Sequence, residues 1–160
     1  MQQGARRKLA TVTEDRTSSI DGSAAIADSL IGKVRSWAEL RDDIRVLVLV
    51  GSHARGAARA DSDIDFVLTC SNPLQYLNNA SWLSMFGEIM SFSFEDWGKV
   101  QSVRVFYRNG PEVEFGITGV DWAAVPVDDG TASVLRTGSS VLFDRDGQIE
   151  AALRVVHGAA

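Results

Sequence analysis

The chain has 160 residues and a formal net charge of −5, with 45% hydrophobic and 23% charged residues. We expect one soluble globular domain with a real core, because this length is too short for two domains of ordinary size. No run approaches the roughly 20 apolar residues of a membrane span. The acidic balance also argues against a nucleic-acid partner, because such proteins usually carry a basic stripe.

Residues 1–20 are polar, and their basic residues are not followed by the apolar segment of a secretory signal. We predict a flexible tail over 1–20 and a single domain over 21–160. Cys70 is the single cysteine, so no internal disulfide forms, and a buried, inert thiol is expected. Together these features favour a cytoplasmic protein with no membrane partner.

Apolar residues recur every three or four positions between residues 21 and 41, which predicts an amphipathic helix capped by Asp21 or Ser23. Beyond it, a hairpin is indicated by the Asn109-Gly110 pair between two apolar alternating stretches. The expected strands are 44–50, 64–69, 102–107 and 112–118, and the expected helices are 21–41, 74–86, 148–156 and a short one that begins at 51 and ends between 56 and 59. The stretch 87–98 stays open, although 89–94 alternates like a strand, and apolar residues at 134–135 and 141–143 help to close the domain. Strands and helices alternate before the hairpin, so we predict an α/β (α+β) fold with a mixed β-sheet flanked by helices.

Two acids separated by one residue, Asp63 and Asp65, stand at the start of the apolar stretch 64–69. On a strand both side chains point to the same face, while Ile64 and Phe66 turn into the core. Neighbouring carboxylates repel one another unless a cation lies between them, and hard oxygen ligands suit Mg²⁺. A solvated acidic strand face is the alternative for the pair taken alone.

Gly51-Ser52 directly follows the most strand-like stretch, 44–50. Glycine lets the backbone approach a ligand closely, and a strand-to-helix junction presents N–H groups to phosphate oxygens. Ser52 can add a hydroxyl, and Arg55 or Arg59 can meet phosphate charge, although both arginines can equally be solvated. The segment lacks the Gly-Lys-Ser/Thr of a Walker loop and the dinucleotide fingerprint.

A third acid is expected from a neighbouring strand if two metal ions are bound. Glu114 fits, because it lies between the apolar Val113 and Phe115 in the second strand of the predicted hairpin. Glu112 shares its face but is nearer the turn, so we prefer Glu114. The alternative for Glu114 is an exposed cross-strand partner.

These residues together resemble the nucleotidyltransferase superfamily typified by DNA polymerase beta. The resemblance rests on Gly51-Ser52, ten residues, Asp63-Ile64-Asp65 and then Val113-Glu114-Phe115, with Ser62 before the first acid also matching. It is similar in form to minimal nucleotidyltransferases and to aminoglycoside and lincosamide adenylyltransferases, which the segment 144–147 also resembles. The resemblance implies a nucleotidyltransferase fold. The chain departs from the antibiotic-modifying enzymes in leaving no room for their helical second domain.

The resemblance also implies roles for the residues. Two Mg²⁺ ions, or Mn²⁺, would be held by Asp63, Asp65 and Glu114, with Glu114 beside the attacking hydroxyl as general base. ATP would be the co-substrate, held by Gly51 and Ser52 with help from Arg55 and Ser62.

Three functions are then open. The first is transfer of a nucleoside monophosphate, AMP from ATP, to a hydroxyl of a small acceptor such as an aminoglycoside-like antibiotic. The second is a minimal nucleotidyltransferase antitoxin that nucleotidylates a HEPN-type protein partner, and the third is a degenerate binding domain. A homodimer is compatible with each of them.

Overall fold

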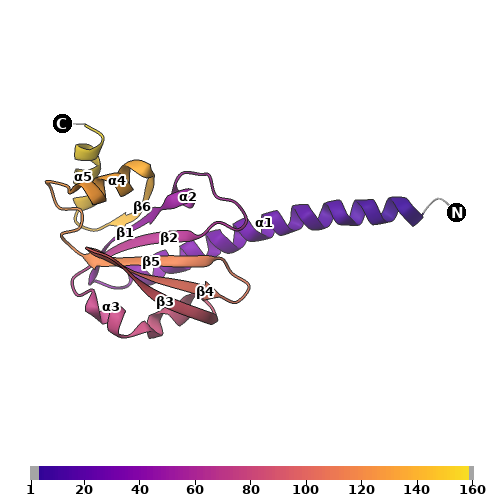
Figure 1. Cartoon of the computed structure of the whole chain (residues 1–160), viewed down its shortest axis with the longest axis horizontal. Helices are drawn as coiled ribbons and strands as arrows, with labels where there is room; N and C mark the ends of the chain where they lie inside the picture. The colour runs from indigo at the N-terminus through magenta and orange to yellow at the C-terminus, as the bar shows by residue number, and fades with distance from the viewer. Residues whose placement is uncertain (1–3, 159–160) are drawn as a thin grey trace.

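The structure is a computed structural model that describes the backbone of residues 4–158 and the side chains of residues 22–158. Its strands form one sheet with helices on both faces, and the N-terminal part of α1 extends away from the sheet (Figure 1). The elements in chain order are α1 (Gly4–Glu39), β1 (Ile44–Val50), α2 (Gly51–Ala54), β2 (Ile64–Cys70), α3 (Leu74–Asn78), η1 (Ala80–Phe86), β3 (Ile89–Trp97), β4 (Val100–Tyr107), β5 (Glu112–Gly119), α4 (Asp129–Thr137), β6 (Ser139–Asp144) and α5 (Gln148–Val156).

The sheet has six strands in the order β3-β4-β5-β2-β1-β6. Strands β2 and β5 are parallel, and every other neighbouring pair is antiparallel. The sheet is therefore mixed and flanked by helices, which confirms the predicted fold class. The β2–β5 pairing places the starts of these two strands side by side.

Strand β1 is apolar on both faces because each face packs against a helical layer. Leu47 and Leu49 belong to one buried cluster, whereas Val46 and Val48 belong to the other. Full burial of each such side chain contributes roughly 1.5–3 kcal/mol relative to exposure. Buried side chains therefore pack on both faces of β1, next to β2, which carries Asp65 and directly follows Asp63.

One face of the sheet is covered by α1, α3 and η1. Helix α1 contributes Ala27, Leu30, Val34 and Ala38, whose spacing of three or four residues forms a single stripe. Aromatic rings complete this layer: Trp37 stacks on Trp82 at 5.2 Å between ring centroids. The other face is covered over β1 and β2 by α4 and α5, through residues such as Leu135 and Ile149.

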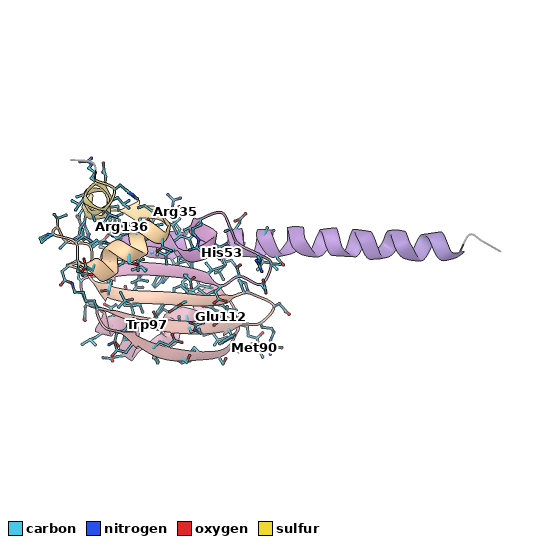
Figure 2. All side chains as sticks on the ribbon, turned by 45° about the horizontal axis from the view of Figure 1, so that its top comes forward. Arg35, His53, Met90, Trp97, Glu112 and Arg136 are labelled. Carbon is cyan, nitrogen blue, oxygen red and sulfur yellow. The ribbon has the colours of Figure 1, made fainter. Side chains whose placement is uncertain are left out.

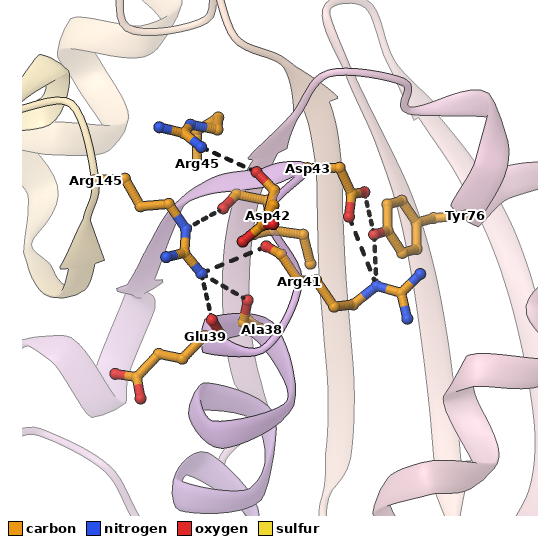
Figure 3. A network of polar contacts seen from close by, with 9 residues as sticks. Ala38, Glu39, Arg41, Asp42, Asp43, Arg45, Tyr76 and Arg145 are labelled. Atoms are coloured by element: carbon orange, nitrogen blue, oxygen red, sulfur yellow. Dashed lines mark hydrogen bonds and ion pairs between the residues drawn. The ribbon is translucent and has the colours of Figure 1, made fainter.

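The C-terminal end of α1 is tied to β1 and to the segment after β6 (Figure 3). The guanidinium of Arg145 donates to the carbonyl of Glu39 at 2.6 Å and to that of Ile44 at 2.7 Å. Nearby, Arg41 Nε donates to the Tyr76 hydroxyl at 2.8 Å, and this hydroxyl donates to Asp43. A cation at a helix C-terminus satisfies carbonyls that have no partner within the helix.

Helix α1 differs from its prediction at both ends. It begins at Gly4, so neither Asp21 nor Ser23 caps it, and most of the segment expected to be a tail is helical. No proline interrupts residues 4–39, which allows the helix to continue through this polar region. Leu40 lies beyond the helix and is 86% exposed. The division into a flexible tail and one domain stays a prediction.

Other elements also differ in their bounds. The helix expected over 74–86 is divided at Asn79, whose extended backbone separates α3 from η1 and whose side chain accepts from Ser81 N. The short helix expected from 51 to between 56 and 59 ends earlier, at Ala54, and Gly56 then takes a positive φ of 68°. Strand β1 and helix α5 have the predicted bounds, and the β4–β5 hairpin is confirmed. No helix among residues 4–158 is both long and apolar enough for a membrane span.

Candidate active site

The parallel pairing of β2 and β5 brings the predicted acids together. Asp65 is the register partner of Glu114, and Ile64 is the partner of Val113. Because side chains alternate along each strand, Asp65 and Glu114 project to one face while their neighbours Ile64 and Val113 are fully buried on the other. Asp63 and Glu112 directly precede Ile64 and Val113, the first register pair of the two strands.

Arg104 on β4 lies among these carboxylates. It is opposite Glu114 in the antiparallel β4–β5 register. Its guanidinium contacts Glu112 at 2.6 Å, Glu95 at 3.1 Å, Glu114 at 3.5 Å and Asp63 at 3.7 Å. One cation is therefore shared among acids from β3, β5 and the loop before β2.

The carboxylates nonetheless remain crowded. The pKa of Asp65 is raised to about 6, chiefly by burial and then by the charges of Glu114 and Asp63, against the opposing effect of Arg104. The pKa of Asp63 is also raised, first by burial and then by the charge of Glu112. A site whose anions resist ionisation in this way favours additional positive charge. We refer to Asp63, Asp65, Glu95, Glu112 and Glu114 as the acidic cluster.

Gly51 lies against the acidic cluster. Its φ is +76°, and a Cβ added there would be 2.6 Å from Asp65 Oδ2. Any larger residue would have to displace the carboxylate and adopt a strained backbone. The absence of a side chain at this position therefore lets the Asp65 carboxylate lie directly against the β1–α2 junction, where Ser52 follows.

The other predicted phosphate-binding residues lie around this junction. The aliphatic part of Arg55 packs on Gly138, since a Cβ there would be 2.4 Å from Arg55 Cγ. Ser62 closes the loop before β2, where its hydroxyl accepts from Arg59 N at 2.7 Å. Ser62, Arg59 and His53 also line a cavity of about 330 Å³ that residues of α1 line from the other side. Their binding roles stay predictions.

The donor set of the acidic cluster fits a hard divalent cation in its chemistry. Asp65 and Glu114 offer carboxylate oxygens from one face of two adjacent strands, Asp63 directly precedes β2, and the Asp65 carboxylate lies against Gly51. Among the residues that the structure describes, no group of three acids, histidines or cysteines already converges on one metal position. Glu114 and Asp63 are turned toward Arg104 instead.

A cavity of about 620 Å³ opens directly beside the acidic cluster. Asp65 and Glu114 form one end of it, and the strand faces of β2, β5 and β4 form its floor. We call it the Trp97 pocket after the residue at its rim. In Figure 2, Trp97 and Glu112 lie toward opposite ends of the sheet. The full lining is Val50, Asp65, Phe66, Val67, Trp97, Lys99, Val100, Ser102, Glu114, Gly116, Trp122, Asp128, Gly130, Thr131 and Val134.

Sequence reasoning missed Arg104 and Glu95. Arg104 lies between the buried Val103 and Val105, the same pattern of one charge between two core residues that identified Glu114. The hairpin turn also fixed the register that places Arg104 opposite Glu114. Glu95 carried no comparable signal, because β3 is an edge strand whose side chains are mostly exposed.

Similar solved structures include the following three, each with a TM-score below 0.5. An aminoglycoside 6-adenyltransferase from Bacillus subtilis is 14% identical with a TM-score of 0.46, covering 59% of this chain and 34% of that one. Cid1 in complex with the UTP analogue UMPNPP is 12% identical with a TM-score of 0.47, covering 82% and 40%. The non-canonical poly(A) polymerase complex GLD-2–GLD-3 is 16% identical with a TM-score of 0.41, covering 70% and 43%.

The chain thus spans less than half the length of each of these proteins. No match is found among curated protein sequences. A comparison with protein families, in contrast, matches residues 27–157, which include both helical layers, the whole sheet and the acidic cluster. Since this match extends over most of the sequence, the chain belongs to the streptomycin adenylyltransferase family.

Proposed function

We propose that the chain transfers AMP from ATP to a hydroxyl group of a small acceptor, such as an aminoglycoside-like antibiotic. The observation that carries the proposal is the placement of Asp65 beside Glu114, with Asp63 two residues before Asp65 and the Asp65 carboxylate against Gly51. Family membership supports nucleotidyl transfer as the reaction class. The name of the family supports an aminoglycoside as the acceptor.

In this proposal each residue has a distinct task. Asp63 and Asp65 bind the metal-bound triphosphate, and Gly51 and Ser52 receive its terminal phosphates. Glu114 orients the acceptor hydroxyl and accepts its proton as the oxygen forms a bond to the α-phosphorus and the bond to pyrophosphate breaks. Mg²⁺, when bound by the three acids, would neutralise charge on the phosphates and lower the pKa of the hydroxyl.

Arg104 is a positioning residue in this account. It contacts Glu112, Glu114 and Asp63 from the adjoining strand, and so limits the repulsion among them. Release of Glu114 and Asp63 from Arg104 would accompany metal binding. Glu112 and Glu95, which hold Arg104 at the shortest distances, would keep the guanidinium in place during that change.

The alternative of a HEPN-type protein acceptor gains no support from the family match or from the similar structures. The acceptor is therefore best sought first among small molecules. The net charge of −5 favours a cationic compound over an anionic one.

The test is to incubate the purified chain with ATP, Mg²⁺ and a panel of aminoglycosides, and to search by mass spectrometry for products carrying AMP. We expect at least one adenylylated aminoglycoside and stoichiometric pyrophosphate. Glu114→Gln should abolish the product. Glu150→Gln is the matched control, because Glu150 is an exposed acid on α5 that pairs with Arg154 away from the site. Pyrophosphate release without an aminoglycoside product, on addition of a protein acceptor, would contradict the proposed acceptor class.

A further inference from the structure

We propose that the Trp97 pocket is the nucleoside subsite, in which the nucleobase of the nucleotide lies on the strand floor under the Trp97 ring. The proposal rests on the proposed function and adds where its nucleotide lies. The pocket continues directly from the acids: Val67 follows Asp65 by two residues on the same face of β2, and Gly116 follows Glu114 on β5. Two residues of strand span about 6.5 Å, so a phosphate held at the acids places its attached nucleoside over this floor.

The floor of the Trp97 pocket is apolar, and at Gly116 no side chain rises from it. A Cβ on Gly116 would be 2.9 Å from Val100 Cγ1 and 3.1 Å from the carbonyl oxygen of Phe66. The side chain of Val100 therefore lies over Gly116, and it forms the base of the pocket together with Val67. A surface of this kind suits the face of a planar ring. An acceptor rich in hydroxyl and amino groups would leave many of them without hydrogen-bond partners there.

Trp97 lines the pocket from the neighbouring edge strand β3. It is 63% exposed, whereas Trp122, which also lines the pocket, is only 3% exposed. Trp97 ends β3 and pairs with Val100, so its ring belongs to the strand next to the floor. A large aromatic ring exposed beside an apolar floor can stack on a base, and such stacking tolerates any base because every base has a π-face.

The far end of the pocket is polar. Lys99 Nζ contacts Asp128 Oδ2 at 2.7 Å, and the other oxygen of Asp128 accepts from Thr131 N at 2.8 Å. A donor and an acceptor therefore stand next to each other at the pocket wall. The edge of a nucleobase likewise carries a hydrogen-bond donor next to an acceptor. Lys99 and Asp128 Oδ2 can therefore bind that edge while Asp128 Oδ1 keeps its hydrogen bond from Thr131 N at the start of α4.

The test uses adenosine as probe, in EDTA, so that neither metal nor triphosphate is required. Calorimetry would measure adenosine affinity for the wild type, Trp97→Ala, Trp97→Phe and the control Phe94→Ala. Phe94 lies on the same strand and is 52% exposed, but it pairs with Val103 and faces away from the pocket. Thermal melting of each variant checks that it is folded.

We expect Trp97→Ala to bind adenosine at least about 10-fold more weakly, the size of one lost base–aromatic stack. Trp97→Phe should stay within about 3-fold of the wild type because it keeps an aromatic ring, and Phe94→Ala should be unchanged. The affinity for MgATP should fall in the same order.

Three results would overturn the proposal: no adenosine binding by the wild type, equal affinity in folded Trp97→Ala, or a Trp97→Ala effect confined to the KM of the acceptor. A failure of the proposed function is separate, since it would appear as absence of AMP transfer while adenosine still binds in a Trp97-dependent way.

Discussion

Among the residues that the structure describes, two regions each gather several acids and arginines from different elements, and their charges are balanced differently. At the segment after β6, Asp144 accepts from the backbone N–H groups of Gln148 and Glu150. Asp146 pairs with Arg45 at 2.7 Å, and Arg145 donates to carbonyls at the end of α1. Each of these charged groups has its own partner, and the result joins α1, β1 and α5.

The acidic cluster has the opposite character, because Arg104 is divided among four carboxylates. Two aspartates show the difference. The hydrogen bond from Arg45 lowers the pKa of Asp146, whereas burial and the neighbouring acids raise that of Asp65 to about 6. Charges that have individual partners stabilise a fold, while crowded anions create a demand for a cation. We therefore propose a structural role for the first region and a binding role for the second.

The largest expected effect separates the two glutamates of β5. Glu114→Gln should reduce AMP transfer by about 10²–10⁴-fold, since it removes the proposed proton acceptor. Glu112→Gln, which changes a residue held by Arg104 at 2.6 Å, should cost at most about 10-fold. Steady-state kinetics with a fixed acceptor would measure both. Equal losses in the two variants would contradict the distinct role of Glu114.

Arg104→Met should sharpen the assignment of the acidic cluster. Without the guanidinium the carboxylates repel one another, so the melting temperature in EDTA should fall by several degrees. Mg²⁺ should then raise it by more in the variant than in the wild type, because the ion binds the folded state and relieves the repulsion. Differential scanning fluorimetry across a Mg²⁺ titration is the measurement. An identical Mg²⁺ response in both proteins would show that Arg104 does not share the ion's site.

Arg145→Gln tests the structural region. Loss of its hydrogen bonds to the α1 carbonyls should lower the free energy of unfolding by about 1–2 kcal/mol, with transfer activity per folded molecule unchanged. Urea unfolding would measure the change. Arg154→Gln is the control, since Arg154 makes an exposed pair with Glu150 within one helix and should cost under about 0.5 kcal/mol.

The smallest expected effect is a pH dependence of the metal-free protein. Because the folded-state pKa of Asp65 lies above its unfolded value of about 3.9, folding favours the protonated form. The contribution of Asp65 to stability is therefore greatest below about pH 4 and is lost as the pH rises through about 6. Allowing for solvent screening, the loss is about 1 kcal/mol. Unfolding in EDTA at several pH values should show this component in Asp146→Asn but not in Asp65→Asn.

Much of this arrangement could be predicted from the sequence because its determinants are local. Alternation along β2 placed Asp63 and Asp65 on one face, and the Asn109-Gly110 turn fixed the β4–β5 hairpin. The family resemblance, carried by residues 51–65 and 113–115, led to the correct fold and family.

What could not be predicted depends on contacts between distant segments. The parallel register that pairs Asp65 with Glu114 joins strands separated by more than forty residues, and no local pattern specifies it. Segment 144–147 resembled a family motif, but its acids and arginine prove to hold helix ends and β1. The split between α3 and η1 at Asn79 was likewise not predicted from the apolar pattern of residues 74–86.

Calorimetric binding of MgATP to Asp65→Asn, with Asp146→Asn measured beside it, tests directly whether the acidic cluster binds the metal–nucleotide complex. Each variant removes one carboxylate charge from an aspartate that interacts with an arginine, Arg104 for Asp65 and Arg45 for Asp146. We predict that Asp65→Asn loses metal-dependent ATP binding, because an amide cannot replace the lost charge, while Asp146→Asn binds as the wild type does. Unchanged MgATP affinity in a folded Asp65→Asn protein would contradict the assignment of the acidic cluster as the metal–nucleotide site.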